Sequence, residues 1–468
     1  MKWLERPRNA AWFIMAVSAL HALYNLFLPF YPDEAYYWVW SRHLALSYYD
    51  HPPMVAYLIR LFTLGSDNLL LVRLTTVVCM GVAAWFIYRL AHEMFSPQVA
   101  ALSLVLCMLL PGTNAGYTLV TPDSPLIMFW AMALYYCWRA ITTGRGRDYV
   151  AAGVVLGGLL LSKYTSVLFF GFLFLFLLLR RPRLLLRKEP WLAVLLSLVL
   201  FLPVVIWNAD HGWISFAFQY QHGTDTSFGI HWGRFFEFFG GLFVLFSPVF
   251  FAVMLGAAAR VKDFWGDDDK FYLVLGFLVP LLFFLYKGLF KKMELNWVAP
   301  ALLPGVIYLA QVVDSYRLRR TFRVGAVVSA LLIVVMFFPG LFPFPPKINP
   351  HNRLFGYRQG VEEVVRLKQP GDALFADHLT IASILTYYAP GHPSVMIPIP
   401  TRPSEYTFWD KGLDYSKMHG ICLATHPREA ALRKVFSHVV LLEHFVARAP
   451  GFRPRNFYIY RCGDSEGP

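Results

Sequence analysis

Residues 31–53 read YPDEAYYWVWSRHLALSYYDHPP, and they begin where the first long apolar segment of the chain ends. Asp33 and Glu34 open this stretch, a cluster of tyrosine and tryptophan follows, and Asp50 and His51 stand before two prolines at its end. Ionisable groups beside a membrane span are costly to keep there and mark functional sites by default. The stretch therefore predicts a polar site at a membrane surface.

The bulk composition is that of a membrane protein. Of 468 residues, 57% are hydrophobic and 15% are charged, against about a quarter charged in typical soluble domains, and the mean hydropathy is +0.48. The formal net charge of +13 is spread over short basic clusters between apolar segments, which indicates topology signals rather than a nucleic-acid surface. Five cysteines without a CxxC spacing predict neither a disulfide framework nor a zinc site.

Eleven apolar segments are candidates for membrane spans. They lie near residues 10–30, 69–91, 97–112, 122–142, 149–162, 164–180, 190–207, 236–259, 271–287, 297–313 and 322–342. The first of them follows Lys2, Arg6 and Arg8 and so also fits a signal peptide. Its length and the Pro-Asp-Glu at its end favour a span that is retained.

Alternate loops between these segments carry the Lys and Arg clusters, which places the N-terminus in the cytoplasm. With an odd number of spans, one set of segments then lies outside: the loops at 31–68, 111–123, 208–235 and 288–296, and everything after residue 343. Asp33 and Asp123 are therefore expected on the same side of the membrane.

The chain changes character after Pro343–Pro346, a stiff PFPP segment. Short strand-like runs such as ALFAD, SVMIPI, GICLAT and FYIYRC follow. They alternate with helical patterns near 357–368, 380–388 and 427–436. We expect a membrane domain over residues 1–345 and a small soluble α/β domain outside the membrane over 346–468. Cys422 and Cys462 fall on predicted strands there, and either a disulfide or two buried free thiols fits them.

Five motifs carry a family resemblance. They are PDEAYYW at 32–38, YYDHPP at 48–53, TPDSPL at 121–126, LSKYT at 161–165 and ELNWVAPALLP at 294–304. In this order the chain resembles the GT-C glycosyltransferases of the PMT_2 type, in particular the ArnT-like branch that uses polyprenyl-phosphate sugars. The expected fold class is thus a polytopic α-helical GT-C membrane protein with about eleven transmembrane helices and juxtamembrane helices, plus the C-terminal α/β domain. The resemblance implies inverting transfer of a sugar from a lipid phosphate to an acceptor.

Such a transfer needs a base that takes a proton from the acceptor hydroxyl, and cations that hold the phosphate leaving group. Asp33 is the candidate base, because it begins a helical pattern at the water boundary and matches the family's catalytic acid of the first loop; helix capping is the alternative. Glu34 points in another direction on that helix, as a substrate ligand or a support. Asp123 matches the family's second external acid and is the other catalytic candidate. It would orient sugar or acceptor hydroxyls, with helix capping again the alternative.

The expected outer side is poor in cations, so those present there are candidates for binding the donor phosphate. Snorkelling to lipid headgroups is the alternative for each of them. The candidates are Lys163 in a tight turn and Lys287, Lys291 and Lys292, with Glu294 and Asn296 beside the last three as further substrate ligands.

The turn from Asp50 to Pro53 is expected to face the same phosphate, and Tyr36 of the aromatic cluster is a further substrate-binding candidate. The ArnT-like pattern often has lysine where this chain has His51. Histidine can donate a hydrogen bond to phosphate, but its charge near neutral pH depends on its surroundings. A structural hydrogen bond is the alternative for this residue.

The loop at 207–235 places His222 among aromatic and polar side chains. Such a surface suits sugar rings or an isoprenoid chain, and the loop could close over the site as a lid. The spacing of its histidines supports no particular metal geometry. We therefore expect no cofactor, with a divalent metal as the less favoured alternative.

Two other classes of protein stay open. A lipid or sugar transporter would also have many spans, but it would place polar residues near the middle of the bilayer, whereas the acids here cluster at one interface. Within the enzymes, an oligosaccharyltransferase or glycan ligase with a lipid-pyrophosphate donor is the nearest alternative. For the favoured function we expect a monomer in the bacterial inner membrane with a periplasmic C-terminal domain. Its partners are membrane lipids, an undecaprenyl-phosphate sugar donor and a lipid A-like or other glycan acceptor, without nucleic acid.

Overall fold

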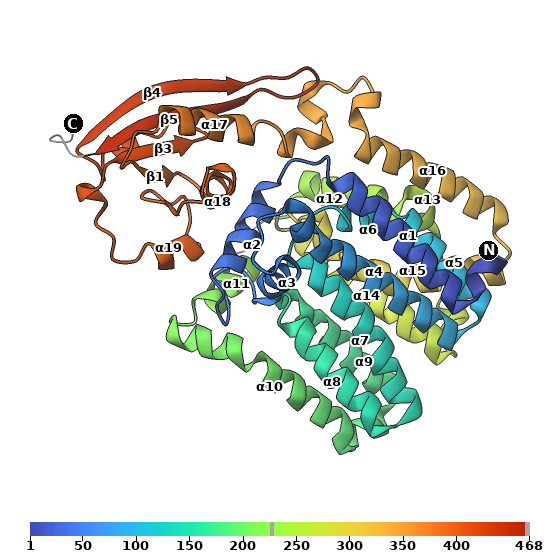
Figure 1. Ribbon diagram of the computed structural model, residues 1–468. Coiled ribbons are helices and arrows are strands. Elements are labelled where there is room, and N and C mark those ends of the chain that lie inside the picture. The colour runs from blue at the N-terminus through green and yellow to red at the C-terminus, as the bar shows by residue number, and fades with distance from the viewer. Residues whose placement is uncertain (225–228, 464–468) are drawn as a thin grey trace. The chain divides into compact units, whose positions relative to one another are not determined.

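The structure is a computed structural model that describes residues 1–224 and 229–463, with the side chains of 222–224 outside the description. Figure 1 shows its helices and strands. Because residues 225–228 and 464–468 are left out, every statement about the fold concerns the described ranges.

The chain divides into two compact units. The helical unit consists of Met1–Leu26 and His51–Met336, and the mixed unit consists of Phe27–Asp50 and Phe337–Pro468. The sequence placed residues 27–50 in a membrane domain that ended near residue 345. In the structure they group with the C-terminal part of the chain instead, and Asp33 therefore belongs to the mixed unit.

The helical unit is a bundle of long and short helices (Figure 1). In chain order they are α1 (Pro7–Asn25), α3 (Met54–Thr63), α4 (Leu69–Met94), α5 (Pro97–Leu109), α6 (Pro111–Gly116), α7 (Asp123–Thr143), α8 (Gly146–Leu160), α9 (Val167–Arg180), α10 (Lys188–Asp210), α11 (Ile214–Thr224), α12 (Trp232–Phe246), α13 (Pro248–Ala258), α14 (Asp268–Gly288), α15 (Ala299–Ser315) and α16 (Arg319–Phe337). Each apolar segment predicted from the sequence coincides with one or two of these helices. By length and composition, five helices among the described residues can cross a membrane, or six if the bent pair α12 and α13 is one span.

The predicted span at 236–259 is not one continuous helix. It breaks between α12 and α13, which are bent by 104° relative to each other. Ser247 lies at the break with φ +68°, and Pro248 follows it. Pro248 takes the first position of α13, where its missing N–H costs nothing. A proline also disfavours the helical conformation of the residue before it, so α12 ends before Ser247.

The two ends of α7 carry different polar groups. Near its C-terminal end, Arg139 Nη1 lies 2.8 Å from Glu93 Oε1 and Arg139 Nε lies 3.6 Å from Asp148 Oδ1. Asp123 begins the same helix, about 24 Å away at 1.5 Å per residue. The predicted cytoplasmic cluster and the predicted outer acid thus lie at opposite ends of this helix.

Two glycines let α8 and α10 approach closely. A Cβ atom added at Gly153 would lie 2.8 Å from the carbonyl oxygen of Ala193, and one at Gly157 would lie 2.6 Å from Leu200 Cδ1. The two glycines are four positions apart and share one face of α8, which is the small-residue spacing that brings membrane helices together.

The mixed unit combines α2 with a five-stranded sheet of order β2-β1-β3-β5-β4. Its elements are α2 (Pro32–Arg42), α17 (Tyr357–Leu367), β1 (Ala373–Ala376), α18 (Leu379–Tyr388), β2 (Val395–Met396), α19 (Glu405–Trp409), β3 (Gly420–Ala424), α20 (Glu429–Leu432), β4 (His438–Ala447) and β5 (Arg455–Gly463). β1 pairs in parallel with β2 and β3, whereas β5 pairs antiparallel with β3 and β4. All five residues of β3 are buried, as expected for a central strand.

Most elements predicted for the C-terminal region are present in the mixed unit. The helix predicted at 427–436 is shorter, covering only Glu429–Leu432, and α19 was not predicted. Cys422 and Cys462 are both buried and free, which agrees with the thiol alternative. α18 packs against α2, and the Phe30 N–H donates to Tyr388 Oη over 3.0 Å. The start of α2 is thereby fixed within this unit.

We predict that Gly153→Val loosens the contact between α8 and α10. The new side chain collides with a main-chain oxygen that cannot move aside, and overpacking of this kind costs about 1–3 kcal/mol. Thermal unfolding of the purified protein in detergent measures the effect as a lower Tm. Gly171→Ala is the control, because a Cβ atom there meets nothing within 4 Å. Equal Tm values for the two variants would contradict the packing argument.

Candidate active site

Asp33 and Glu34 occupy the first turn of α2. Pro32 takes the first helical position, where its missing N–H costs nothing, and the Tyr31 N–H donates to Glu34 Oε2 over 3.1 Å. Glu34 is fully buried, whereas Asp33 is partly exposed. Glu34 therefore closes the start of the helix, and Asp33 is the acid of the pair that solvent can reach.

Asp33 has an unusual electrostatic environment. Burial raises its pKa, and the neighbouring carboxylates Glu34 and Asp50 add to the rise. The guanidinium groups of Arg353 and Arg402 act in the opposite direction, and the resulting pKa lies above the ordinary value of an aspartate. A carboxylate whose pKa is moved towards neutral is better suited to accept a proton during a reaction.

Asp50 is buried and bonded through both carboxylate oxygens. Tyr36 Oη donates to Oδ2 over 2.9 Å, and Arg402 Nη1 donates to Oδ1 over 2.8 Å. A buried carboxylate is costly unless charge and hydrogen bonds compensate it, and these two partners do so. Asp50 and Tyr36 were predicted as substrate ligands. Here each is hydrogen-bonded within the protein, and their role as substrate ligands stays a prediction.

Glu405 continues this network at the start of α19. Its backbone N–H donates to Tyr36 Oη over 3.1 Å, and its Oε2 accepts the Tyr49 N–H over 2.8 Å. Its side chain is enclosed by the protein, with 3% of the residue exposed. Burial raises the pKa of Glu405 to about 7, although the bond from Tyr49 acts to lower it.

Sequence reasoning missed Arg353, Arg402 and Glu405. They follow α2 by more than three hundred positions and stand in no recognised motif. The available signal is weak: Arg402 and Glu405 carry the only formal charges between residues 393 and 409. Their proximity to α2 depends on how the mixed unit folds, which no local pattern encodes.

The helical unit brings together three residues that the sequence predicted separately. Lys163 Nζ lies 2.7 Å from Asp123 Oδ1, and Asn296 Nδ2 donates to Asp123 Oδ2 over 2.7 Å. The side chains of Lys163 and Asp123 are only 6% and 13% exposed. With both oxygens engaged, Asp123 is arranged to hold Lys163 and Asn296 in position.

The turn before α3 is attached to the same end of the helical unit. The Met54 N–H donates to the carbonyl oxygen of Leu161 over 3.0 Å, two residues before Lys163. His51 is partly buried and precedes Met54 in this turn. The predicted grouping of His51 with Lys163 is therefore compatible with the path of the chain.

The remaining predicted ligands are more dispersed. Lys292 Nζ lies 3.4 Å from Glu294 Oε1, and these side chains are 69% and 45% exposed. Lys291 Nζ contacts the carbonyl oxygen of Gln221 at 3.5 Å, and Lys287 lies in the last turn of α14. The side chain of His222 lies outside the described residues.

Metal ligands do not gather in the part of the chain that the structure describes. No group of three or more His, Cys, Asp or Glu side chains there is arranged to hold an ion. The acids near α2 are instead accompanied by arginine.

The chain is similar to known glycosyltransferases. The family model described as dolichyl-phosphate-mannose-protein mannosyltransferase, PMT_2, matches residues 50–207. The lipid A galacturonosyltransferase RgtD of Rhizobium johnstonii is 27% identical over 368 residues, 76% of this chain and 77% of the relative. The undecaprenyl phosphate-alpha-4-amino-4-deoxy-L-arabinose arabinosyl transferase 1 of Pseudomonas fluorescens is 26% identical over 336 residues, 64% of this chain and 54% of the relative. These matches confirm the resemblance predicted from the sequence.

The fold also has a solved counterpart. The crystal structure of ArnT from Cupriavidus metallidurans bound to undecaprenyl phosphate covers 97% of this chain and 98% of its own, with a TM-score of 0.67 and 14% sequence identity. At this identity the likeness concerns the fold, and it confirms the predicted GT-C class.

We predict that Glu405 makes the mixed unit more stable at acidic than at alkaline pH. Its pKa rises from an ordinary 4.5 to about 7 on folding, so the native state binds more protons than the unfolded state between these values. The contribution of Glu405 to the free energy of unfolding is then fully present below pH 4.5 and is lost as the pH rises through 7. Glu405→Gln keeps an acceptor for Tyr49 and removes this titration.

Thermal unfolding of the wild type and Glu405→Gln from pH 5 to 8 measures the difference. The variant should be the more stable protein at pH 8 and should have a flatter profile. Glu362→Gln, at an exposed acid, is the control and should follow the wild type. A pH profile of Glu405→Gln identical to that of the wild type would show that Glu405 does not titrate in this range.

Proposed function

We propose that the chain is an inverting membrane glycosyltransferase that transfers a sugar from an undecaprenyl-phosphate donor to a lipid A-type acceptor at the periplasmic face of the bacterial inner membrane. Both curated relatives are named as glycosyltransferases; lipid A appears in one name and undecaprenyl phosphate in the other. The observation that carries the proposal is the match to the lipid A enzyme over three quarters of both chains. The raised pKa of Asp33 supplies the chemistry that such an enzyme needs.

Asp33 acts as the general base in this proposal. It takes the proton of an acceptor hydroxyl while that oxygen bonds to the anomeric carbon of the sugar. The bond between the anomeric carbon and the phosphate oxygen breaks, and undecaprenyl phosphate leaves with the electron pair. Attack from the face opposite the leaving group inverts the anomeric centre. Protonated Asp33 then returns its proton to solvent.

Lys163 and His51 are the proposed partners of the donor phosphate. The leaving phosphate gains charge in the transition state, so a cation fixed near it lowers the barrier. The 2.7 Å contact with Asp123 supports this role because it fixes the direction of the ammonium group of Lys163. Asp123 is then a positioning residue rather than a second base, and Asn296 helps to hold its carboxylate.

The finer topology belongs to the same proposal. All eleven predicted spans cross or enter the membrane, with the shorter helices tilted or enclosed by others and α12 and α13 forming one broken segment. The N-terminus is cytoplasmic, and the C-terminal domain after residue 345 is periplasmic. One copy of the chain supplies the base and the phosphate ligands, and the chemistry proceeds through side chains without a metal.

Purified protein in liposomes tests the function directly. Undecaprenyl phosphate carrying a radiolabelled sugar and lipid A are supplied in the same membrane, and label in lipid A is measured after chromatography. Transfer of label to lipid A is the expected result. Movement of unmodified donor or sugar across the membrane, without transfer, would instead identify a transporter.

We predict that Asp33→Asn lowers the transfer rate by about 10²–10⁴-fold, the usual contribution of a general base. Asparagine has nearly the same shape, so folding and donor binding should be retained; Tm and binding of the labelled donor verify this. Asp414→Asn is the matched control, because Asp414 is an exposed acid of the same unit that pairs with Lys417. A rate for Asp33→Asn within a factor of about three of the control would exclude Asp33 as the base.

A further inference from the structure

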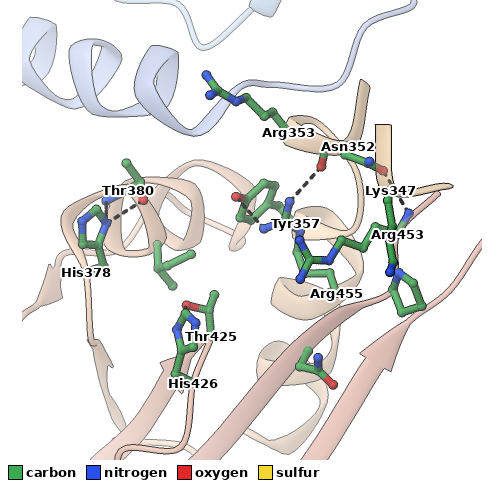
Figure 2. Close-up of a pocket in the computed structure, with 13 residues that line it drawn as sticks. Lys347, Asn352, Arg353, Tyr357, His378, Thr380, Thr425, His426, Arg453 and Arg455 are labelled. Atoms are coloured by element: carbon green, nitrogen blue, oxygen red, sulfur yellow. Dashed lines mark hydrogen bonds between the residues drawn. The ribbon is translucent and has the colours of Figure 1, made fainter. Parts of the chain in front are cut away.

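A polar pocket lies within the mixed unit, and it shares Arg353 with the surroundings of Asp33 described above. It has a volume of about 430 Å³, which is within the range of about 300–1,000 Å³ found for small-ligand sites. Figure 2 shows its lining side chains, which come from the segment before α17, the start of α18 and the ends of strands β3 and β5. It is therefore built from well-separated parts of the C-terminal sequence.

The pocket is strongly basic. Its lining includes the cations Lys347, Arg353, Arg453 and Arg455 and the imidazole side chains of His378 and His426, and it contains no aspartate or glutamate. Elsewhere in the mixed unit, arginines commonly pair with an acid, as Arg428 does with Asp377 and Arg461 with Asp372. A group of cations without carboxylates in the same cavity favours an anionic ligand.

Arg455 is held rigidly in this pocket by neutral groups. Its Nε donates to the carbonyl oxygen of Phe355, its Nη1 to Tyr357 Oη and its Nη2 to the carbonyl oxygen of Asn352, each over 2.8 Å. The guanidinium also lies over the Tyr357 ring at 4.0 Å. These contacts fix its position but leave its charge uncompensated by any acid in the described part of the chain.

His378 adds a neutral donor. Its Nδ1 accepts the Thr380 N–H over 3.3 Å and lies 2.8 Å from Thr380 Oγ1 at the start of α18; Figure 2 shows the contact between the two side chains as a dashed line. Burial lowers the pKa of His378, so the ring is neutral near pH 7 and its proton resides on Nε2. A neutral imidazole with this tautomer can donate one hydrogen bond to a ligand.

Arg353 connects the pocket with the proposed base. It is a lining residue, its Nη1 contacts Tyr31 Oη at 3.4 Å, and its charge lowers the pKa of Asp33. The charge of Asp33 also acts to raise the pKa of Tyr357, which lines the same pocket. A ligand held in the pocket would therefore lie close to the first turn of α2, all within one compact unit.

The lining favours a headgroup over a lipid chain. Ile381 and Pro454 are its only fully apolar members, whereas a polyprenyl tail needs a long apolar groove. The undecaprenyl donor is thus poorly matched to this cavity. A saccharide bearing phosphate is well matched, because arginine binds phosphate oxygens through paired N–H groups and the remaining polar side chains suit hydroxyls.

We propose that this pocket binds a phosphate group on the saccharide headgroup of the acceptor glycolipid and thereby holds an acceptor hydroxyl within reach of Asp33. The proposal rests on the proposed function, because it concerns the acceptor of the same transfer. It assigns acceptor recognition to the C-terminal domain, through residues that take no part in binding the donor.

The test uses Lys347→Gln with Arg453→Gln in the full-length protein. Both side chains are exposed, so removing their charges should leave the fold intact, and Tm checks this. With lipid A that carries its phosphates, the double variant should raise the acceptor KM at least about tenfold, as loss of hydrogen bonds to a charged group implies. The donor KM and kcat should change little. With lipid A from which the phosphates have been removed, wild type and variant should have the same acceptor KM.

Lys411→Gln with Lys434→Gln is the matched control, because it removes two exposed charges of the mixed unit away from the pocket. It should behave as the wild type. Inorganic phosphate, at the concentration at which the soluble phosphorylated headgroup saturates the site, should compete only weakly, since a free ion lacks the saccharide contacts. Competition as strong as that by the headgroup would identify a free-phosphate site and overturn the proposal.

The outcomes separate this proposal from the function on which it rests. An unchanged acceptor KM in the pocket variant, with active transfer by the wild type, would refute the acceptor site and leave the glycosyltransferase intact. A raised donor KM would assign the pocket to the donor and refute it as well. Absence of transfer by the wild type with either lipid A would instead refute the function.

Discussion

The buried carboxylate of Asp50 is the contact on which the arrangement around α2 depends. It receives hydrogen bonds from Tyr36 in α2 and from Arg402, 352 positions later in the chain. A charge buried in this way is stable only while both partners remain. It therefore ties the stretch that carries Asp33 to the C-terminal part of the sequence, and it places Arg402, one of the two arginines that lower the pKa of Asp33.

Two acids that look equivalent in the sequence have different environments in the structure. Asp123 has both oxygens occupied by Lys163 and Asn296, which suits an acid that positions a cation. Asp33 is influenced by Arg353 and Arg402 through their charge, and burial raises its pKa. A base needs a carboxylate that is available for a proton, so the assignment of roles follows from what surrounds each acid rather than from the motif.

Local patterns were sufficient to predict most of the helices. Apolar length located the long helices of the helical unit, and the acid-rich helix starts singled out Asp33 and Asp123 as candidates. The break between α12 and α13 was not predicted, because Pro248 stands inside an otherwise apolar run. A proline at such a place allows either a kinked helix or a sharp turn, and the sequence does not distinguish the two. Arg402 and Glu405 could not be predicted, because they matter only through hydrogen bonds to Asp50 and Tyr36. Those partners lie more than three hundred residues earlier in the chain. The basic pocket was missed for the same reason: its cations are scattered from residue 347 to 455, and only the fold of the mixed unit brings them together.

The pH dependence of the transfer reaction tests the central role of Asp33 most directly. The acceptor kcat/KM of the wild type is expected to fall tenfold per pH unit on the acidic side, through a pKa above the ordinary value of an aspartate. The residual activity of Asp33→Asn should lack this acidic limb. The same limb in both proteins would show that another group accepts the proton and would contradict the account.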